Sequence, residues 1–238
     1  MKTVKDKVII ITGASAGIGL AAARLLAAQG AFVALAARSK ETLEMLREEI
    51  PGSFAVPVDM SDETDIKAMI HKVKEHFGRI DVLVNNAGQG LYGPIEHVGI
   101  HSYRKILDLN VIGPLVAMQQ VIPIMRAQGS GHILNISSLV SKNYFPYLGA
   151  YASTKYALNC LSLTARVELE KDNIVVNVMH PGLTDTGFGK NSIKTEGMDQ
   201  FPFSREGMPE PDSAEHVAER ILHAIESDRA EVMAHEEA

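Results

Sequence analysis

Short apolar runs alternate with longer helical patterns along the 238 residues of the chain. The short runs are rich in β-branched residues, which is typical of buried strands, whereas the longer segments repeat their apolar positions with the period of a helix. Strands are predicted at residues 7–12, 32–37, 54–58, 81–85, 131–136 and 174–179, with a weaker last strand at 231–234. Helices are predicted at residues 18–29, 40–50, 62–77, 102–127, 151–171 and 213–227.

This alternation of strands and helices predicts an α/β fold, namely a Rossmann-type, doubly wound parallel sheet of about seven strands with helices on both faces. No linker, internal repeat or low-complexity segment divides residues 1–238, so we expect a single domain. Ligands of such sheets bind at the carboxyl ends of the strands, near the point where the strand order reverses. Residues that directly follow predicted strands are therefore the first candidates for a site.

A glycine-rich turn follows the first predicted strand. Residues 12–19 read Thr-Gly-Ala-Ser-Ala-Gly-Ile-Gly and lead into an Ala- and Leu-rich segment that favours helix. Glycines lack a Cβ, so the backbone can turn sharply and approach a ligand closely. The N–H groups and dipole of the following helix attract a phosphate, so we expect a bound dinucleotide. An ordinary tight turn between a strand and a helix is the alternative. The expected contacts from this turn are Gly13, Ser15, Gly17, Ile18 and Gly19.

The end of the second predicted strand indicates which dinucleotide is bound. A carboxylate near this point is typical of NAD sites, because it accepts hydrogen bonds from the adenosine ribose and repels a 2′-phosphate. This sequence has Ala37 there, followed by Arg38, whose guanidinium suits a phosphate. The charges therefore favour NADP(H), with NAD(H) as a second cofactor, and a solvated surface arginine is the alternative interpretation of Arg38.

Four polar residues are candidates for catalysis, with a structural Tyr–Lys pair, an ordinary serine loop and a solvated asparagine as the alternatives. Tyr151 and Lys155 are four residues apart in a predicted helix, so both side chains lie on one face. An ammonium near a phenol favours the phenolate and is expected to lower the pKa of Tyr151. Ser138 follows the fifth predicted strand, where its hydroxyl can donate to a substrate carbonyl. Asn110 is a polar amide in the middle of a predicted helix, where asparagine is a mediocre helix former.

The order of these motifs resembles the short-chain dehydrogenase/reductase family over nearly the whole chain. The glycine spacing T-G-x-x-x-G-x-G, the Asn-Asn-Ala-Gly of residues 85–88, the Tyr-x-x-x-Lys pair and the Pro-Gly of residues 181–182 appear in family order. The resemblance implies Tyr151 as general acid/base, Ser138 as the group that polarises the carbonyl, Lys155 as the residue that tunes the tyrosine and clamps the cofactor ribose, and Asn110 as the anchor of a proton-relay water. It also implies cofactor contacts by Asp59 and Met60 at the adenine, by Asn86, Ala87 and Gly88 at the adenosine ribose, by Pro181, Gly182 and Thr184 at the nicotinamide, and by Thr186 at the carboxamide.

The segment 182–212, called the lid segment below, interrupts the regular alternation. It is rich in glycine and proline, follows the carboxyl end of a strand and is expected to cover the ligand crevice as a mobile lid; a disordered surface loop is the alternative. Apolar and aromatic residues expected near the crevice suggest an apolar or aromatic carbonyl substrate, although several of them are also interpretable as packing residues. They are Leu91, Tyr92, Tyr144, Tyr147, Phe188, Met198, Phe201 and Phe203.

Composition and charge narrow the possible partners. The formal net charge is -6 and no run of Lys or Arg stands out, so nucleic acid and anionic membranes are not expected as partners. No signal peptide or membrane-spanning run is expected, and the nine His show no metal-ligand spacing. The single cysteine, Cys160, excludes an internal disulfide, which is consistent with a cytoplasmic protein, and it is expected to pack in the core. Many family members end in a longer glycine-rich tail at an oligomer interface, so here the expected homodimer or homotetramer depends on the helices at 102–127 and 151–171.

The sequence thus predicts an NADP-dependent oxidoreductase that transfers a hydride between nicotinamide and a carbonyl or alcohol. The alternative from another class is a non-catalytic protein that senses a dinucleotide on the same fold, but such a protein is expected to have lost part of the catalytic group. A sugar-nucleotide epimerase or dehydratase would have a different glycine spacing and a larger C-terminal substrate domain.

Overall fold

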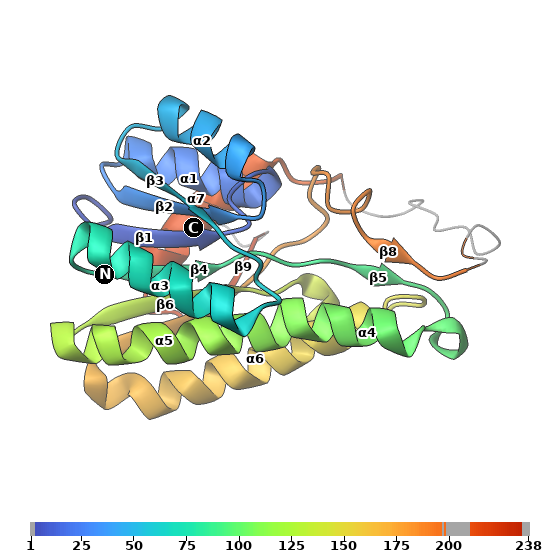
Figure 1. Ribbon diagram of the computed structural model, residues 1–238. Helices are drawn as coiled ribbons and strands as arrows, with labels where there is room; N and C mark the ends of the chain where they lie inside the picture. Colours follow the sequence, from blue (N-terminus) through green and yellow to red (C-terminus); the bar gives the residue numbers. More distant parts are fainter. Residues whose placement is uncertain (1–2, 197, 199–209, 235–238) are drawn as a thin grey trace.

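A seven-stranded parallel sheet lies at the centre of the computed structural model, which describes residues 3–196, 198 and 210–234 (Figure 1). The strand order is β3-β2-β1-β4-β6-β7-β9, and every neighbouring pair is parallel. The strands are β1 (Val8–Thr12), β2 (Phe32–Ala37), β3 (Ser53–Pro57), β4 (Val82–Asn85), β6 (Gly131–Ile136), β7 (Ile174–His180) and β9 (Glu231–Met233). The predicted Rossmann-type α/β fold is confirmed.

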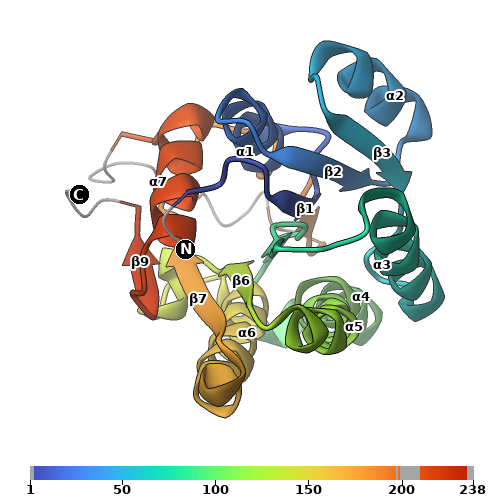
Figure 2. The same ribbon diagram turned by 90° about the vertical axis from the view of Figure 1, so that its left-hand side faces the viewer.

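Helices cover both faces of this sheet (Figure 2). One face packs against α1 (Gly17–Ala28), α2 (Lys40–Glu49) and α7 (Ala214–Glu226), which contribute buried side chains such as Leu26, Leu43 and Ile221. The other face packs against α3 (Glu63–Phe77), α5 (Gly113–Gln128) and α6 (Gly149–Leu169), with buried residues such as Met69, Val121 and Leu169. The central strands are buried on both faces, which explains why their sequences are continuous apolar runs rather than alternating ones.

The strand order reverses at β1, because the chain continues outward from β1 to β3 and then crosses back to β4 on the other side. The glycine turn after β1 and the segment after β4 therefore meet at one edge of the sheet. The segments after β6 and β7 end at the same edge, since all strands are parallel. All four candidate segments are brought to the carboxyl edge of the sheet.

Predicted and observed element boundaries agree within two residues, with one informative difference. The single helix predicted at 102–127 is a continuous run of α4 (Ile100–Leu107), a π-helical turn (Asp108–Ile112) and α5. The structure also contains a two-stranded parallel sheet of β5 (Leu91–Tyr92) and β8 (Ile193–Lys194) that is not predicted from the sequence. Strands of two residues carry too little hydrophobic pattern to be recognised.

Two expectations about single features are wrong. No run long and apolar enough to span a membrane was expected, but the helical run Ile100–Gln128 meets this criterion by length and composition alone. Half of its most apolar window is buried inside the fold, as in a helix that packs into a protein core. Cys160 is exposed rather than buried, because it lies on the side of α6 opposite Leu158 and Ser162, which face the interior.

Candidate active site

The glycine turn has the geometry of an anion cradle. Gly13 and Gly17 have positive φ values of +69° and +53°, which favour glycine, and a Cβ on Gly19 would lie 2.4 Å from the Gly13 carbonyl oxygen. Residue 16, the N-cap of α1, is alanine and supplies no side-chain hydrogen bond to the first turn of the helix. The N–H groups that a capping side chain would occupy therefore remain available to a phosphate, so the turn fits a dinucleotide. Ser15 and Ile18 are half-buried within it.

Thr12 joins this turn to the segment after β4. Its hydroxyl accepts hydrogen bonds from the backbone N–H groups of Asn86 and Ala87, both at 3.0 Å. The Asn86 amide returns a bond to the Thr12 carbonyl at 2.9 Å. Thr12 is the first residue of the glycine motif, and its role is visible only in the structure. The feature of the sequence that indicates a role is a hydroxyl residue at the buried end of an apolar strand, where a polar group needs hydrogen-bond partners.

The four predicted catalytic residues come from three segments: Asn110 from the π-helical turn, Ser138 from the segment after β6, and Tyr151 and Lys155 from α6. Asn110 and Lys155 approach each other beside Gly88. A Cβ on Gly88 would lie 3.3 Å from the Asn110 side-chain oxygen and 3.6 Å from the Lys155 Nζ. Lys155 is 4 % exposed, and its ammonium donates to the Ile136 carbonyl at 2.9 Å. An ammonium has three donors, so Lys155 has others to offer a ribose hydroxyl.

The side chain of Asn110 is fully engaged in holding the site together. Its Oδ1 accepts from the Gln89 N–H at 2.9 Å, and its Nδ2 donates to the Gln89 carbonyl and to the Thr154 hydroxyl. The residue lies in the π-helical turn, and Pro114 follows four positions later. Proline has no N–H, so it cannot give the Asn110 carbonyl the usual α-helical hydrogen bond. This carbonyl is therefore the part of Asn110 that is suited to bind a water.

Tyr151 is buried beside Ser138, and burial dominates its protonation. Loss of water, together with nearby Tyr92, raises the pKa of the Tyr151 phenol well above its usual range, and a hydrogen bond from Ser138 opposes this shift. The expectation that Lys155 lowers this pKa is wrong for this structure. The Lys155 Nζ lies 5.9 Å from the centre of the tyrosine ring and donates to the Ile136 carbonyl. Desolvation is the largest cause of the shift in the Tyr151 pKa. Burial also lowers the pKa of Lys155, to about 8.

The candidate adenosine end is more open. The pKa of Asp59 is lowered, mainly because its carboxylate accepts hydrogen bonds from Ser61. Arg38 is exposed, and its positive charge lowers the same pKa further. Ser39 caps α2 by accepting from the Thr42 N–H. Met60 is buried, with its carbonyl against Gly113.

The described part of the lid segment contacts the glycine turn and Tyr151. The Pro181 carbonyl accepts from Leu139 N–H, close to Ser138, while Thr184 pairs with Asp212 as an isolated bridge and bonds to the Gly182 carbonyl. Thr186 packs on Gly17, where an added Cβ would lie 3.2 Å from its side chain.

Further along, β8 pairs with β5, and Ser192 and Thr195 pack closely over Gly90 and Gly93. The pairing places the lid segment beside the chain that leaves β4. Residues 197 and 199–209, with Phe201 and Phe203 among them, lie outside the described residues.

The structure separates the residues expected near the crevice. Phe188 lies against Tyr151, with ring centres 5.6 Å apart, and Tyr92 is close enough to affect its pKa. Leu91 is instead buried with Ile106 and Ala150 as a packing residue. Tyr144 is 93 % exposed and stacks on Tyr156. Tyr147 occupies a left-handed backbone conformation, and its carbonyl accepts from the Gly93 N–H.

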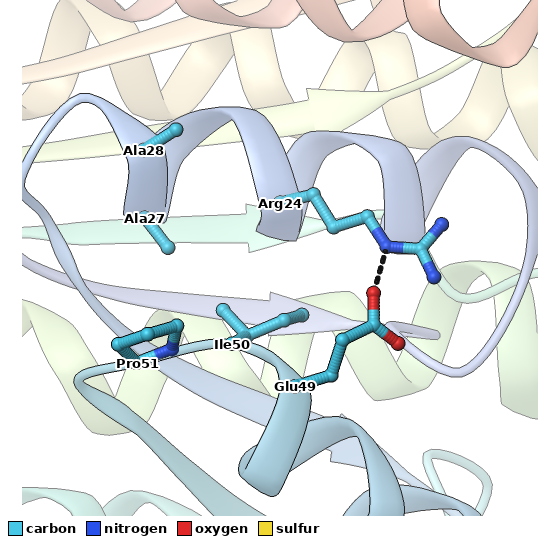
Figure 3. Close-up of a pocket in the computed structure, with 6 residues that line it drawn as sticks. All are labelled: Arg24, Ala27, Ala28, Glu49, Ile50 and Pro51. Carbon is cyan, nitrogen blue, oxygen red and sulfur yellow. Dashed lines mark hydrogen bonds and ion pairs between the residues drawn. The ribbon is translucent and has the colours of Figure 1, made fainter.

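A separate surface hollow lies between α1 and α2 (Figure 3). The charged groups at its rim, Arg24 and Glu49, bond to each other at 2.8 Å, and the other lining residues are alanine, isoleucine and proline. It offers no catalytic side chain. Across the described residues, no group of three or more His, Cys, Asp or Glu is arranged to hold a metal ion.

Comparison with known proteins identifies the family of the chain. The family model for short chain dehydrogenase matches residues 7–197. A mouse protein, dehydrogenase/reductase SDR family member 7B, is 30% identical over 237 residues, covering 96% of this chain and 73% of its own. The chain belongs to the short-chain dehydrogenase/reductase family.

Solved structures of dehydrogenases and reductases superpose closely on it. One is a 3-ketoacyl-(acyl-carrier-protein) reductase from Brucella melitensis in complex with NADH, with a TM-score of 0.86, 27% identity and coverage of 97% of both chains. Another is an alcohol dehydrogenase from Thermococcus sibiricus in complex with 5-hydroxy-NADP, with a TM-score of 0.84, 29% identity and coverage of 96% of both chains. The protein is thus an NAD(P)-dependent oxidoreductase, and the family acts on small molecules and commonly forms oligomers.

Proposed function

We propose that this protein reduces a small apolar or aromatic ketone or aldehyde, or oxidises the corresponding alcohol, with NADP(H) as the preferred cofactor. The observation that carries the proposal is the buried Tyr151 phenol, bonded to Ser138, at the same edge of the sheet as the glycine turn. A non-catalytic sensor of dinucleotides has no need for all four groups in one place.

Each residue has a distinct part in the proposed reaction. The cofactor supplies or accepts the hydride at its nicotinamide ring. Ser138 donates a hydrogen bond to the substrate oxygen and stabilises the negative charge that develops there. Tyr151 gives its proton to that oxygen in reduction and takes it back in oxidation. Because burial raises the pKa of the phenol, Tyr151 carries its proton at neutral pH before the substrate binds.

Two residues support the tyrosine and replace its proton. The Lys155 ammonium has donors for the cofactor ribose and carries a positive charge beside the phenol. The Asn110 carbonyl, which Pro114 cannot bond, holds a water that returns a proton toward Lys155 and Tyr151. Phe188 and Tyr92 give the substrate side an apolar, aromatic surface.

A panel of aliphatic and aromatic ketones, aldehydes and alcohols, assayed with NADPH, NADH and their oxidised forms, tests the proposal. We expect turnover of apolar carbonyl compounds at higher kcat/KM with NADPH. Binding of either dinucleotide without turnover of any panel member, at enzyme concentrations high enough to detect slow reduction, would favour the sensor instead.

Cofactor preference is expected to depend on Arg38. A charge-assisted hydrogen bond contributes about 1.5–3 kcal/mol, so Arg38→Ala is expected to weaken NADPH binding by roughly 10- to 150-fold while NADH binding is retained. Arg38→Asp adds a carboxylate that repels the phosphate and is expected to reverse the preference. Position 38 is used because Arg38 is exposed, whereas Ala37 is buried.

The measurement is kcat/KM for both cofactors, with Arg47→Ala as the matched control. Arg47 is exposed on α2 and pairs with Glu44, so its loss changes the net charge equally without touching the site. An unchanged ratio of NADPH to NADH in both Arg38 variants would leave Arg38 as a surface residue and remove the basis for NADP(H).

A further inference from the structure

A buried histidine lies directly behind the Ser138 turn. His180, the last residue of β7, is fully buried at 0 % exposure. Its Nδ1 is 3.4 Å from both the Ser138 carbonyl oxygen and the Ser141 hydroxyl. That hydroxyl donates to the Ser138 carbonyl at 2.6 Å. The ring therefore supports the short turn that presents the Ser138 hydroxyl.

The last strand of the sheet supplies the partner of this histidine. Glu231, the first residue of β9, accepts from His180 Nε2 at 3.0 Å and also pairs with Lys142. β7 and β9 are parallel, and Glu231 lies opposite Val178. Side chains of one strand alternate between the faces, so Val178 and His180 share a face and Glu231 reaches His180 diagonally.

The charges around the ring favour one arrangement of its protons. Burial, assisted by the Lys142 cation, lowers the pKa of His180, while Glu231 and the Ser138 carbonyl oppose that shift. A neutral ring next to a carboxylate keeps its proton on Nε2, so Nδ1 is an acceptor. The single Ser141 hydroxyl proton then lies between its main acceptor, the Ser138 carbonyl at 2.6 Å, and the more distant Nδ1 at 3.4 Å. Asn159 donates to the same hydroxyl at 2.9 Å.

We propose that Glu231 and His180 are positioning residues, which hold the turn at residues 138–141 so that the Ser138 hydroxyl stays directed at Tyr151 and the substrate oxygen. The proposal rests on the proposed function, because it concerns the same serine. The turn itself is only the three-residue 3-10 helix η3 (Leu139–Ser141), and such a helix needs support from outside. Further support comes from the Leu139 N–H bond to the Pro181 carbonyl.

The kinetic test compares two changes at Glu231. Glu231→Ala removes the acceptor, and misplacement of Ser138 is expected to lower kcat by about 10-fold with the KM for NADPH unchanged. Glu231→Gln keeps an oxygen that accepts from His180 Nε2, so it is expected to restore most of kcat. Glu219→Ala, which removes an exposed carboxylate from α7, is the matched control. Wild-type kcat in Glu231→Ala, or an equal loss in both Glu231 variants, would overturn the proposal.

A second measurement is independent of activity. The His180 ring proton is followed by NMR as pH is varied and is assigned with His180→Gln. Glu231→Gln removes a charge that favours the cation and should lower the His180 pKa further, whereas Lys142→Ala should raise it. An unchanged His180 pKa in Glu231→Gln would mean that the His180–Glu231 pair does not form in solution. The proposed positioning role would then be wrong even if the enzyme is active. Absence of wild-type turnover with these shifts present would instead contradict the proposed function.

Discussion

Tyr151→Phe is expected to abolish turnover while the cofactor still binds. The ring keeps its packing against Phe188, but the proton that the reaction transfers is lost. General acid–base catalysis contributes about 10²- to 10⁴-fold, and we expect kcat to fall near the upper end of that range because burial leaves the substrate no bulk water as a substitute acid. The measurements are steady-state kcat and a fluorescence titration with NADPH.

Tyr156→Phe is the matched control for this prediction. Tyr156 lies on the same helix, is 37% exposed and stacks on Tyr144 away from the site. It should retain wild-type kcat. If Tyr151→Phe keeps more than about a tenth of the wild-type kcat, Tyr151 is not the acid/base of the reaction.

Lys155→Met is expected to harm both cofactor binding and turnover, because one ammonium serves the ribose and lies beside the phenol. The methionine keeps the length of the side chain without its charge.

The same variant is expected to change how the free energy of unfolding depends on pH. Burial holds the pKa of Lys155 at about 8 in the folded protein, whereas a lysine in the unfolded chain titrates near pH 10.4.

The sign of this effect follows from proton binding. Between about pH 8 and 10.4 the unfolded wild-type chain holds a proton that the folded protein has released, so wild-type stability rises with pH across this window. Lys155→Met lacks this contribution. The difference in free energy of unfolding, variant minus wild type, should therefore fall as pH rises from about 8 to 10.4 in denaturant titrations.

A parallel pH dependence of the two proteins would show that Lys155 is not desolvated in solution. Cofactor affinity is the second measurement. An NADPH affinity equal to that of wild type would remove the ribose contact from the proposed site.

The sequence by itself determines the order of strands and helices and the position of the glycine turn. These features are local, since each depends on the residue types within one run and on the turn directly behind it. The same holds for Tyr151 and Lys155, because a spacing of four residues puts two side chains on one helical face in any fold. The family motifs then locate Asn110 and Ser138, but not how they are held.

Contacts between distant segments decide the rest. Thr12 joins two segments because its hydroxyl accepts from the N–H groups of Asn86 and Ala87. Asn110 is held in place by its hydrogen bonds to Gln89 and Thr154. His180 and Glu231 are 51 positions apart and meet only because β7 and β9 are neighbours in the sheet. No pattern along the chain encodes such a pair.

Burial also reverses an inference that chemistry alone makes plausible. A lysine four residues from a tyrosine suggests a lowered phenol pKa, yet the folded protein removes water from both groups and turns the ammonium toward the Ile136 carbonyl. The sequence supplies the two groups and their common face. Only the tertiary structure decides their protonation, because the free energy of a charge depends on the water and dipoles that packing leaves around it.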